Sequence, residues 1–271
     1  MAWVLRGLRD GVLTTRWPVR PDEYADGWRG PATVLDPGRA GTEAADGSVP
    51  GQLCPTGAIG RRADGGISLD QGRCICCGRC VAARPDLFGW EHGPGSAALA
   101  RGELIVPPVA ETGDALAGIR GSLRERTRAL SRSVHIRHVD AGSDGSEEQE
   151  VYALLNPVYD VHRLGIVFTA SPRHADVLLV TGAGARGMAE PLRVTYKGMP
   201  DPKIVIAAGT DAVSGGLLTS SYATWGGIGQ IVPVDVWVPG SPPSPFSLLY
   251  GLLLGLGRLP APGKNPAGGR P

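Results

Sequence analysis

The sequence predicts an α/β protein in two parts: a mostly parallel sheet covered by helices on both faces, preceded by a small α+β domain that carries the cysteines. From about residue 117, short β-rich runs alternate with helical stretches, as strand–helix–strand units do. Before about residue 110 the chain is rich in Gly, Pro and Arg and contains all five cysteines. We therefore expect a small domain at 1–110, a linker and helix at 111–132, a sheet domain at 133–259 and a disordered tail at 260–271.

The sheet domain is expected to contain five strands. Its β-rich runs are 133–139, 165–170, 176–182, 203–209 and 231–240. Helical stretches are predicted at 118–131, 147–164 and 188–199, so the strands are joined through helices and a parallel sheet follows. The apolar run 246–259 is shorter than the roughly 20 residues that cross a bilayer. It is predicted to form a buried helix or a docking surface, and no membrane span is expected.

Composition restricts the class of function. The chain has 27 basic and 26 acidic residues, which leave a formal charge of +1. With this balance the chain lacks the excess of positive charge that binds nucleic acid or an anionic membrane surface. The N-terminus lacks the apolar core of a signal peptide, and five thiols crowded at two places indicate a metal site rather than a disulfide framework. We therefore expect a cytoplasmic metalloprotein with no nucleic-acid partner.

The spacing of the cysteines matches one of the two ligand sets found in two-cluster ferredoxins. The bacterial ferredoxin run is C-x2-C-x2-C-x3-C-P, and in two-cluster ferredoxins the fourth cysteine of each run binds the other cluster. Four cysteines stand in "CICCGRC", residues 74–80, and the fifth stands in "CPTGAIG", which begins at residue 54. By this crossing rule one ligand set is complete: Cys54, Cys74, Cys77 and Cys80. The other set is absent, because its positions hold Ala44, Gly47, Pro50 and Arg84.

The complete set predicts one [4Fe-4S] cluster, because four soft thiolates suit sulfide-bridged iron. A closed zinc site is the alternative, although zinc usually takes two separate C-x2-C pairs. Cys76 lies between two ligands and is interpreted as a spare thiol. Close backbone approach and N–H bonds to sulfur are expected from Gly57, Gly72 and Gly78.

Two segments resemble subunits of known redox complexes. Residues 8–34 resemble the opening segment of the ferredoxin-like subunits of NADH-quinone oxidoreductase and formate hydrogenlyase, with "WRG" at 28–30 in place of an "FRG"-like turn. Residues from Val134 to about Leu256 include "RHVDAGS", "MPDPKIVIAAG" and "VPVDVWVPGSPPSPFSLLYGLLL". This part resembles the 20 kDa subunit of NADH-quinone oxidoreductase, respiratory complex I, and the small subunit of membrane-bound hydrogenases, particularly the formate hydrogenlyase version.

This second resemblance implies a flavodoxin-like parallel sheet with a terminal [4Fe-4S] cluster near the quinone or nickel–iron site of a large subunit. The chain departs from each of the family's cysteine motifs. "GSCNGCE" is here "GSDGSEE", "GDCA" is "GTDA" and "PGCPP" is "PGSPP". The resemblance therefore puts oxygen-bearing side chains at all four cysteine positions: Asp144, Glu147, Asp211 and Ser241. Hard oxygen ligands do not match sulfide-bridged iron, so the terminal cluster is expected to be absent.

Two interpretations of the acidic replacements stay open. In the first, polar residues refill the emptied pocket and hydrogen-bond to loop amides and to one another. In the second, four carboxylates converge as a hard-oxygen site for Mg²⁺, Ca²⁺ or Mn²⁺, or as a proton-handling group with raised pKa values. The residues of this second interpretation are Asp144, Glu147, Glu148 and Asp211.

The leading functional hypothesis is an iron–sulfur electron-transfer subunit of a complex I-like or hydrogenase-like oxidoreductase, with no catalytic site of its own. The resemblance implies a hydrogenase-like large subunit and membrane-arm subunits as partners, and a peripheral place on the inner face of the cell membrane. Arg173 and His174, after a predicted strand end, are expected on the partner-facing surface. One alternative is a structural or regulatory subunit whose cluster only stabilises it. A third is a carboxylate-metal enzyme centred on Asp144 and Asp211.

Overall fold

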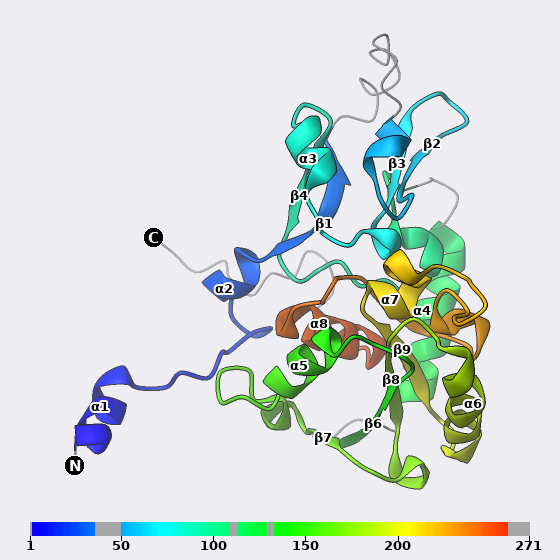
Figure 1. Ribbon diagram of the computed structural model, residues 1–271. Coiled ribbons are helices and arrows are strands. Elements are labelled where there is room, and N and C mark those ends of the chain that lie inside the picture. The colour runs from blue at the N-terminus through cyan, green and yellow to red at the C-terminus, as the bar shows by residue number, and fades with distance from the viewer. Residues whose placement is uncertain (1, 36–49, 109–112, 129, 131–132, 260–271) are drawn as a thin grey trace.

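The computed structural model describes residues 2–35, 50–108, 113–128, 130 and 133–259 of the 271-residue chain (Figure 1). The tail predicted at 260–271 lies outside the described residues, as do the substituted cysteine positions Ala44 and Gly47.

The C-terminal half forms a five-stranded parallel sheet. The strands are β6 (Val134–Asp140), β7 (Ile166–Phe168), β8 (Val177–Thr181), β9 (Ile204–Ala208) and β10 (Val236–Val238). They lie in the order β10-β9-β8-β6-β7, and every neighbouring pair is parallel. Counted from β6, this is the flavodoxin-like order 2-1-3-4-5. The predicted runs and the implied parallel sheet are thus confirmed.

Helices cover both faces of this sheet (Figure 1). On one face, α5 (Ser146–Ala153) and α8 (Pro245–Gly255) pack into a core with alternate strand residues. On the other, α6 (Ala189–Gly198) and α7 (Thr210–Ser214) pack into a second core. The helix predicted near residue 118 is α4 (Gly113–Thr127). Strands β8 and β9 are buried at every residue because both of their faces are covered.

The apolar run near the end of the chain forms a buried helix rather than an exposed surface. In α8, Ser244 caps the N-terminus by accepting a hydrogen bond at Oγ from the backbone N–H of Ser247, at 3.1 Å, and Pro245 begins the first turn. Nine of its eleven residues are buried. Among the described residues, no helix has the length and apolar character needed to cross a bilayer.

The N-terminal part contains two small antiparallel sheets. Strand β1 (Arg29–Val34) pairs with β4 (Phe88–His92), and β3 (Ile67–Asp70) pairs with both β2 (Ile59–Arg61) and β5 (Ile105–Val106). The short helices α2 (Glu23–Asp26) and α3 (Arg79–Ala83) accompany them. This part lies over the end of the large sheet from which α7 begins (Figure 1), and the turn after β3 packs against α7.

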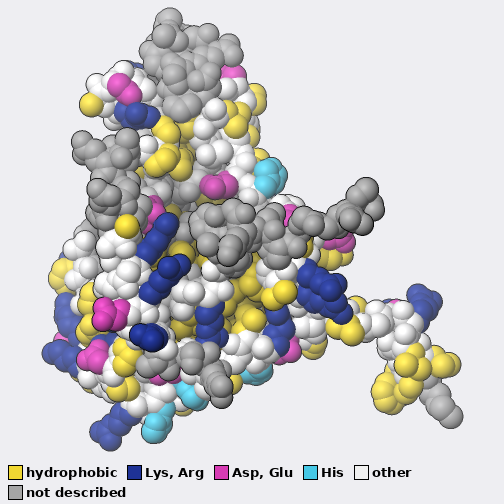
Figure 2. Space-filling model, turned by 180° about the vertical axis from the view of Figure 1, so that it is seen from behind, with side chains coloured by type: hydrophobic (Ala, Val, Ile, Leu, Met, Phe, Trp, Pro, Cys, Tyr) yellow, Lys and Arg dark blue, Asp and Glu magenta, His cyan; other side chains and the backbone are white. Residues whose placement is uncertain are grey.

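The first helix stands away from the rest of the protein. Helix α1 (Ala2–Asp10) projects from the body, and its hydrophobic side chains form a group on the surface (Figure 2). Trp3, Leu5 and Leu8 are all more than two-thirds exposed. It contributes no residue to the three hydrophobic cores of the described chain.

Candidate functional site

Four cysteines from two separate segments of the sequence line one cavity of the N-terminal part, which we call the thiol cavity. Its cysteines are Cys54, Cys74, Cys77 and Cys80. Cys54 follows a 3-10 turn at Pro50–Leu53, and Cys74 ends another at Gln71–Arg73. Gly78, in the left-handed conformation at φ 77°, precedes α3 and brings Cys80 back to the cavity. The empty volume, mouth included, is about 330 Å³.

Backbone amides are directed at two of the sulfur atoms. The N–H of Ala58 donates to Sγ of Cys54 at 3.3 Å, and the N–H of Ala32 donates to Sγ of Cys74 at 3.5 Å. The prediction of glycine donors was wrong at two positions. The N–H of Gly72 is held by the side chain of Asp70, and that of Gly57 by the carbonyl of Cys54. These glycines complete the turns around the cysteines, while alanine amides meet the sulfurs.

The cavity favours the thiolate at one cysteine. Hydrogen bonding from Cys76, together with the Ala32 amide, lowers the pKa of Cys74 to about 6. The same pairing and burial raise the pKa of Cys76, so Cys76 keeps its proton. Burial also raises the pKa of Cys80. Cys76 itself does not line the cavity, in agreement with its interpretation as a bystander. Four thiols around one cavity are, by residue type, a donor set that suits a group held by four thiolates.

A second cluster of polar side chains lies beyond the carboxyl ends of β6 and β9; we call Asp144, Glu147 and Asp211 the acidic site. Glu147, in the first turn of α5, is only 1% exposed. Burial, with the nearby charges of Asp211 and Asp144, raises its pKa to about 7. Burial and Asp144 also raise the pKa of Asp211. Two hydrogen bonds from Ser146, at 2.6 Å and 2.9 Å, lower the pKa of Asp144.

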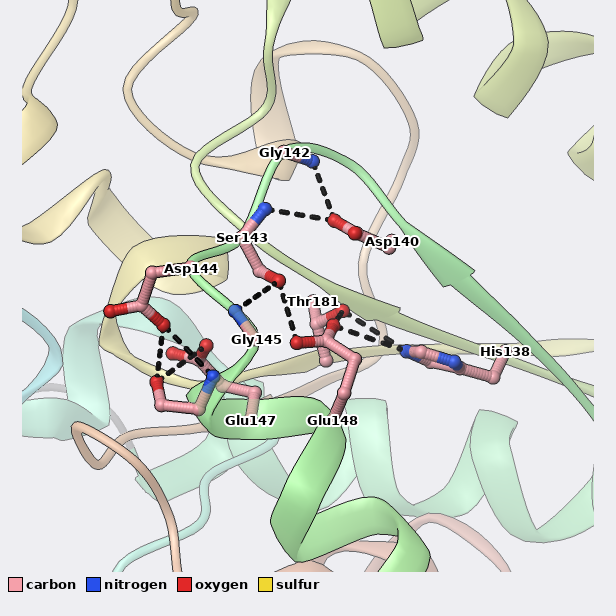
Figure 3. Close-up of polar contacts among 10 residues, drawn as sticks. His138, Asp140, Gly142, Ser143, Asp144, Gly145, Glu147, Glu148 and Thr181 are labelled. Carbon is pink, nitrogen blue, oxygen red and sulfur yellow. Dashed lines mark hydrogen bonds and ion pairs between the residues drawn. The ribbon is translucent and has the colours of Figure 1, made fainter.

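The fourth predicted carboxylate belongs to a different network (Figure 3). Glu148 accepts a hydrogen bond from Ser143 Oγ at 2.6 Å and another from the hydroxyl of Thr181. Its Oε1 lies 3.7 Å from Nε2 of His138, which also contacts Thr181. Asp144, Glu147 and Glu148 each accept a hydrogen bond from a neighbouring side chain, which is the kind of contact that the first interpretation expects.

No single-ion site is apparent in the part of the chain that the structure describes. Within these residues, no three His, Cys, Asp or Glu side chains are arranged to hold one metal ion. The hard-oxygen site predicted for the four carboxylates therefore gains no support from the geometry, since Glu148 faces Thr181 and His138 instead.

The cysteine loop of the thiol cavity is hydrogen-bonded to Thr210, the residue before Asp211 of the acidic site. Oγ1 of the buried Thr210 donates to the carbonyl oxygen of Cys74 at 2.9 Å and accepts from the N–H of Gly240 at 3.1 Å. The backbone N–H of Ser241 points at Cys76 and opposes the rise in its pKa. Thr210 and Ser241 stand in "GTDA" and "PGSPP". The cysteine loop therefore rests on the segments to which the resemblance assigns two lost cysteines.

Other residues that shape this region were not predicted. Asp70 binds Arg101 through two hydrogen bonds of 2.8 Å and 2.7 Å, and also accepts from the N–H of Gly72. An aspartate two residues before a glycine is a signal for such a turn. Its pairing with Arg101, 31 positions later, has no local signal.

Comparison with known proteins places the C-terminal half among redox subunits. Residues 145–254 match the family described as "NADH ubiquinone oxidoreductase, 20 Kd subunit". Formate hydrogenlyase subunit 7 of Escherichia coli (strain K12) is 41% identical over 154 residues, which are 57% of this chain and 59% of that protein. Probable membrane-bound hydrogenase subunit mbhJ of Pyrococcus furiosus is 42% identical over 130 residues, 48% of this chain and 78% of that protein.

One solved structure is also similar. It is the membrane-bound sulfane sulfur reductase (MBS), an archaeal respiratory membrane complex, one chain of which is 29% identical with a TM-score of 0.44. The similarity covers 49% of this chain and 73% of that one. The chain thus spans about three fifths of the formate hydrogenlyase subunit and about three quarters of the matching MBS chain.

Proposed function

Because the chain belongs to the family of the 20 kDa subunit of NADH-ubiquinone oxidoreductase, we propose that it is an electron-transfer subunit of a hydrogenase-like or complex I-like membrane complex. In this proposal its N-terminal part is ferredoxin-like and holds one [4Fe-4S] cluster in the thiol cavity. The terminal cluster of the family is absent, because carboxylates and a serine stand where the resemblance puts its cysteines.

The observation that carries this proposal is the convergence of Cys54 with the cysteines of the 74–80 loop on one cavity. When bound, a [4Fe-4S] cluster accepts and passes single electrons at a potential that hydrogen bonds to sulfur and solvent exposure adjust. The chain supplies the four thiolates. The amides of Ala32 and Ala58 donate hydrogen bonds to two of them, and the exposed Cys77 marks the side open to solvent or to a partner.

Zinc remains the alternative occupant of the four thiolates. Ligands to one zinc ion would meet around a single point, about 2.3 Å from the metal. The thiolates of a [4Fe-4S] cluster each bind a different iron, so they surround a larger volume. The spacing C-x2-C-x2-C with a distant C-P favours the cluster, because zinc usually takes two separate C-x2-C pairs.

The place at which the cysteine loop docks favours a cluster that transfers electrons over a cluster that only stabilises the fold. Thr210 holds the carbonyl of Cys74, and Ser241 faces Cys76. In the family, by resemblance, these segments carry the terminal cluster beside the large subunit. A cluster in the thiol cavity would therefore lie next to the usual exit point for electrons.

The proposed partners follow from the named relatives, which are a formate hydrogenlyase subunit and a probable membrane-bound hydrogenase subunit. We propose a hydrogenase-like large subunit and membrane-arm subunits, which would hold the chain at the inner face of the membrane. Arg173 and His174, both exposed after β7, are proposed contacts to the large subunit.

The test of the cluster is metal analysis of the full-length chain prepared without oxygen. We expect four iron and four sulfide per chain, with an electron paramagnetic resonance signal after reduction. Serine substitution at any of the four ligands should remove most of the iron. The matched control is Cys76→Ser, two positions from Cys74, which should keep it. Zinc in place of iron, or equal iron loss in the Cys76→Ser protein, would contradict the assignment.

A separate measurement distinguishes electron transfer from stabilisation. In the assembled complex, the reduced-cluster signal should appear on adding the electron donor and disappear on adding the acceptor. A cluster that is present but never changes its oxidation state would make the chain a structural or regulatory subunit.

A further inference from the structure

A second cavity lies against β6, and none of the cysteines lines it; we call it the edge cavity. Its volume is about 300 Å³. The residues around it come from β6, from α5 and the turn after it, and from the segment that follows β7: Arg137, His138, Val151, Tyr152, Leu155 and Phe168, with Thr169 and Ala170. We propose that the edge cavity binds a small amphiphilic anion, a carboxylate carried on an aromatic or short aliphatic body.

The cavity exists because β7 is shorter than β6. Strand β7 pairs with β6 only as far as Ile136, opposite Phe168, and the N–H of Thr169 closes the ladder on the carbonyl of Ile136 at 2.8 Å. Strand β6 continues to Asp140. Beyond Ile136, this edge of β6 has no strand beside it in the described part of the chain. The chain turns away after β7, and the edge cavity lies in the space that remains.

An arginine at the wall of the cavity points to an anionic ligand. Nε of Arg137 is buried and has no hydrogen-bond partner, and no ion pair to Arg137 is found among the described residues, although the side chain as a whole is only partly buried. A buried N–H group without a partner costs free energy. The planar guanidinium offers several N–H donors that match the two oxygens of a carboxylate. A bound carboxylate would satisfy Arg137.

Glu148, the acid beside His138, already has other partners. It is held by hydrogen bonds from Ser143 and Thr181 (Figure 3). His138 also lines the cavity. Burial, aided by the charge of Arg137, lowers the pKa of His138. His138 is therefore neutral near pH 7, and the guanidinium is the charge that the cavity offers.

The rest of the wall is apolar and reaches the surface. Val151 is buried. Tyr152 and Leu155 carry large apolar groups, yet they are 66% and 42% exposed. Phe168 lies opposite, at the end of β7. The volume is at the lower end of the range for small-molecule sites. A ligand with one carboxylate and one apolar group of about the size of a benzene ring satisfies both the cation and these walls.

The probe for this proposal is phenylacetate, titrated into the full-length chain by calorimetry. Acetate supplies the charge without the apolar body, and 2-phenylethanol supplies the apolar body without the charge. We expect phenylacetate to bind at least tenfold more tightly than either. Equal binding of phenylacetate and 2-phenylethanol would overturn the role of the cation, and no binding of phenylacetate would overturn the site itself.

Variants locate the binding. Arg137→Gln should weaken phenylacetate at least tenfold and leave 2-phenylethanol unchanged, and Arg137→Lys should be intermediate, because a point charge replaces the planar fork. The control is Arg61→Gln, an exposed arginine of β2 that does not line the cavity, which should bind as the unaltered chain does. Circular dichroism and iron content verify that each variant is folded. A folded Arg137→Gln protein with unaltered phenylacetate affinity would overturn the proposal.

Discussion

The thiol cavity and the acidic site are neighbours with opposite chemistry. Thr210 joins them through the Cys74 carbonyl, so they share a border inside one fold. In the first, sulfur atoms meet backbone N–H groups, and the pKa of Cys74 is lowered. In the second, carboxyl groups are buried close together, and the pKa values of Glu147 and Asp211 are raised. The first region thus favours the thiolate at Cys74, while the second favours the protonated form of Glu147.

This difference teaches that the loops at the end of a parallel sheet do not by themselves determine a metal site. The segments "GSDGSEE", "GTDA" and "PGSPP" lie at the starts of α5, α7 and α8. Their side chains hydrogen-bond to one another and to the cysteine loop. The chemistry of the donor atoms decides which metal a site suits, since thiolates match sulfide-bridged iron and carboxylates do not.

The largest expected effect is a loss of protease resistance after removal of metal, which should affect the N-terminal part but not the sheet domain. Metal contributes to folding free energy only where it is bound. After anaerobic removal of iron, we expect trypsin cleavage at Arg73 and Arg79 to accelerate by more than about tenfold, because local opening exposes the loop. The sheet domain should stay resistant. The measurement is limited proteolysis with mass spectrometry, and equal cleavage rates with and without iron would show that the N-terminal part needs no metal.

The next effect is the pH dependence of stability at the acidic site. Folded Glu147 keeps its proton up to about pH 7, while its ordinary pKa is 4.5. The folded state thus binds more protons between these values, and stability falls as the pH rises through them. Glu147→Gln should flatten this decline and stabilise the chain at pH 8 by up to about 3 kcal/mol.

Urea unfolding at several pH values measures this effect. Glu190→Gln, at an exposed glutamate in the first turn of α6, is the control and should leave the slope unchanged. A slope that is the same in the Glu147→Gln protein would mean that another group is responsible.

A substitution at Thr210 tests how much the contact between the two regions contributes to stability. Thr210→Val keeps the shape of the side chain but leaves the buried carbonyl of Cys74 and the N–H of Gly240 without their partner. We expect a loss of about 2 kcal/mol in the free energy of unfolding. Thr195→Val is the control, because its hydroxyl makes one exposed bond to Pro191 within α6. The control should change stability by less than about 0.5 kcal/mol.

The smallest expected effect concerns the ion pair behind the cysteine loop. Arg101→Gln removes the paired hydrogen bonds to the half-buried Asp70 and should cost about 1 kcal/mol. Arg62→Gln removes the more exposed pair with Asp64 and should cost less than about half of that. Chemical denaturation measures both. Equal losses in the two variants would mean that burial of the Asp70 pair has no energetic consequence.

The sheet could be predicted because each strand is recognisable from its own short run of residues. Runs such as 176–182 and 203–209 are apolar at nearly every position, as strands covered on both faces must be, and they became β8 and β9. The common cavity of Cys54 and the 74–80 loop was also predictable, since the ligand-crossing rule connects positions that lie 20 residues apart. In both cases the signal is a pattern of residue types along the chain.

The remaining features depend on contacts that leave no such pattern. The bond from Thr210 to Cys74 spans 136 positions and uses a hydroxyl and a carbonyl, groups that most segments possess. The alanine donors to sulfur were missed for the same reason, because any residue has a backbone N–H. The edge cavity arises from the difference in length between β6 and β7, and the missing partner of Arg137 is apparent only when its neighbours are known.

The two hydrogen bonds of the Thr210 hydroxyl also determine when the cysteine loop can dock during protein synthesis. The cysteine loop leaves the ribosome first, yet its support at Thr210 comes 136 positions later, and Gly240, which fixes Thr210, comes 30 positions after that. Domains generally begin to fold as the N-terminal segments emerge. The loop must therefore remain undocked until the segment up to Gly240 has been made. If the chain holds the proposed cluster, iron can be inserted during this interval, while the cysteines are still accessible.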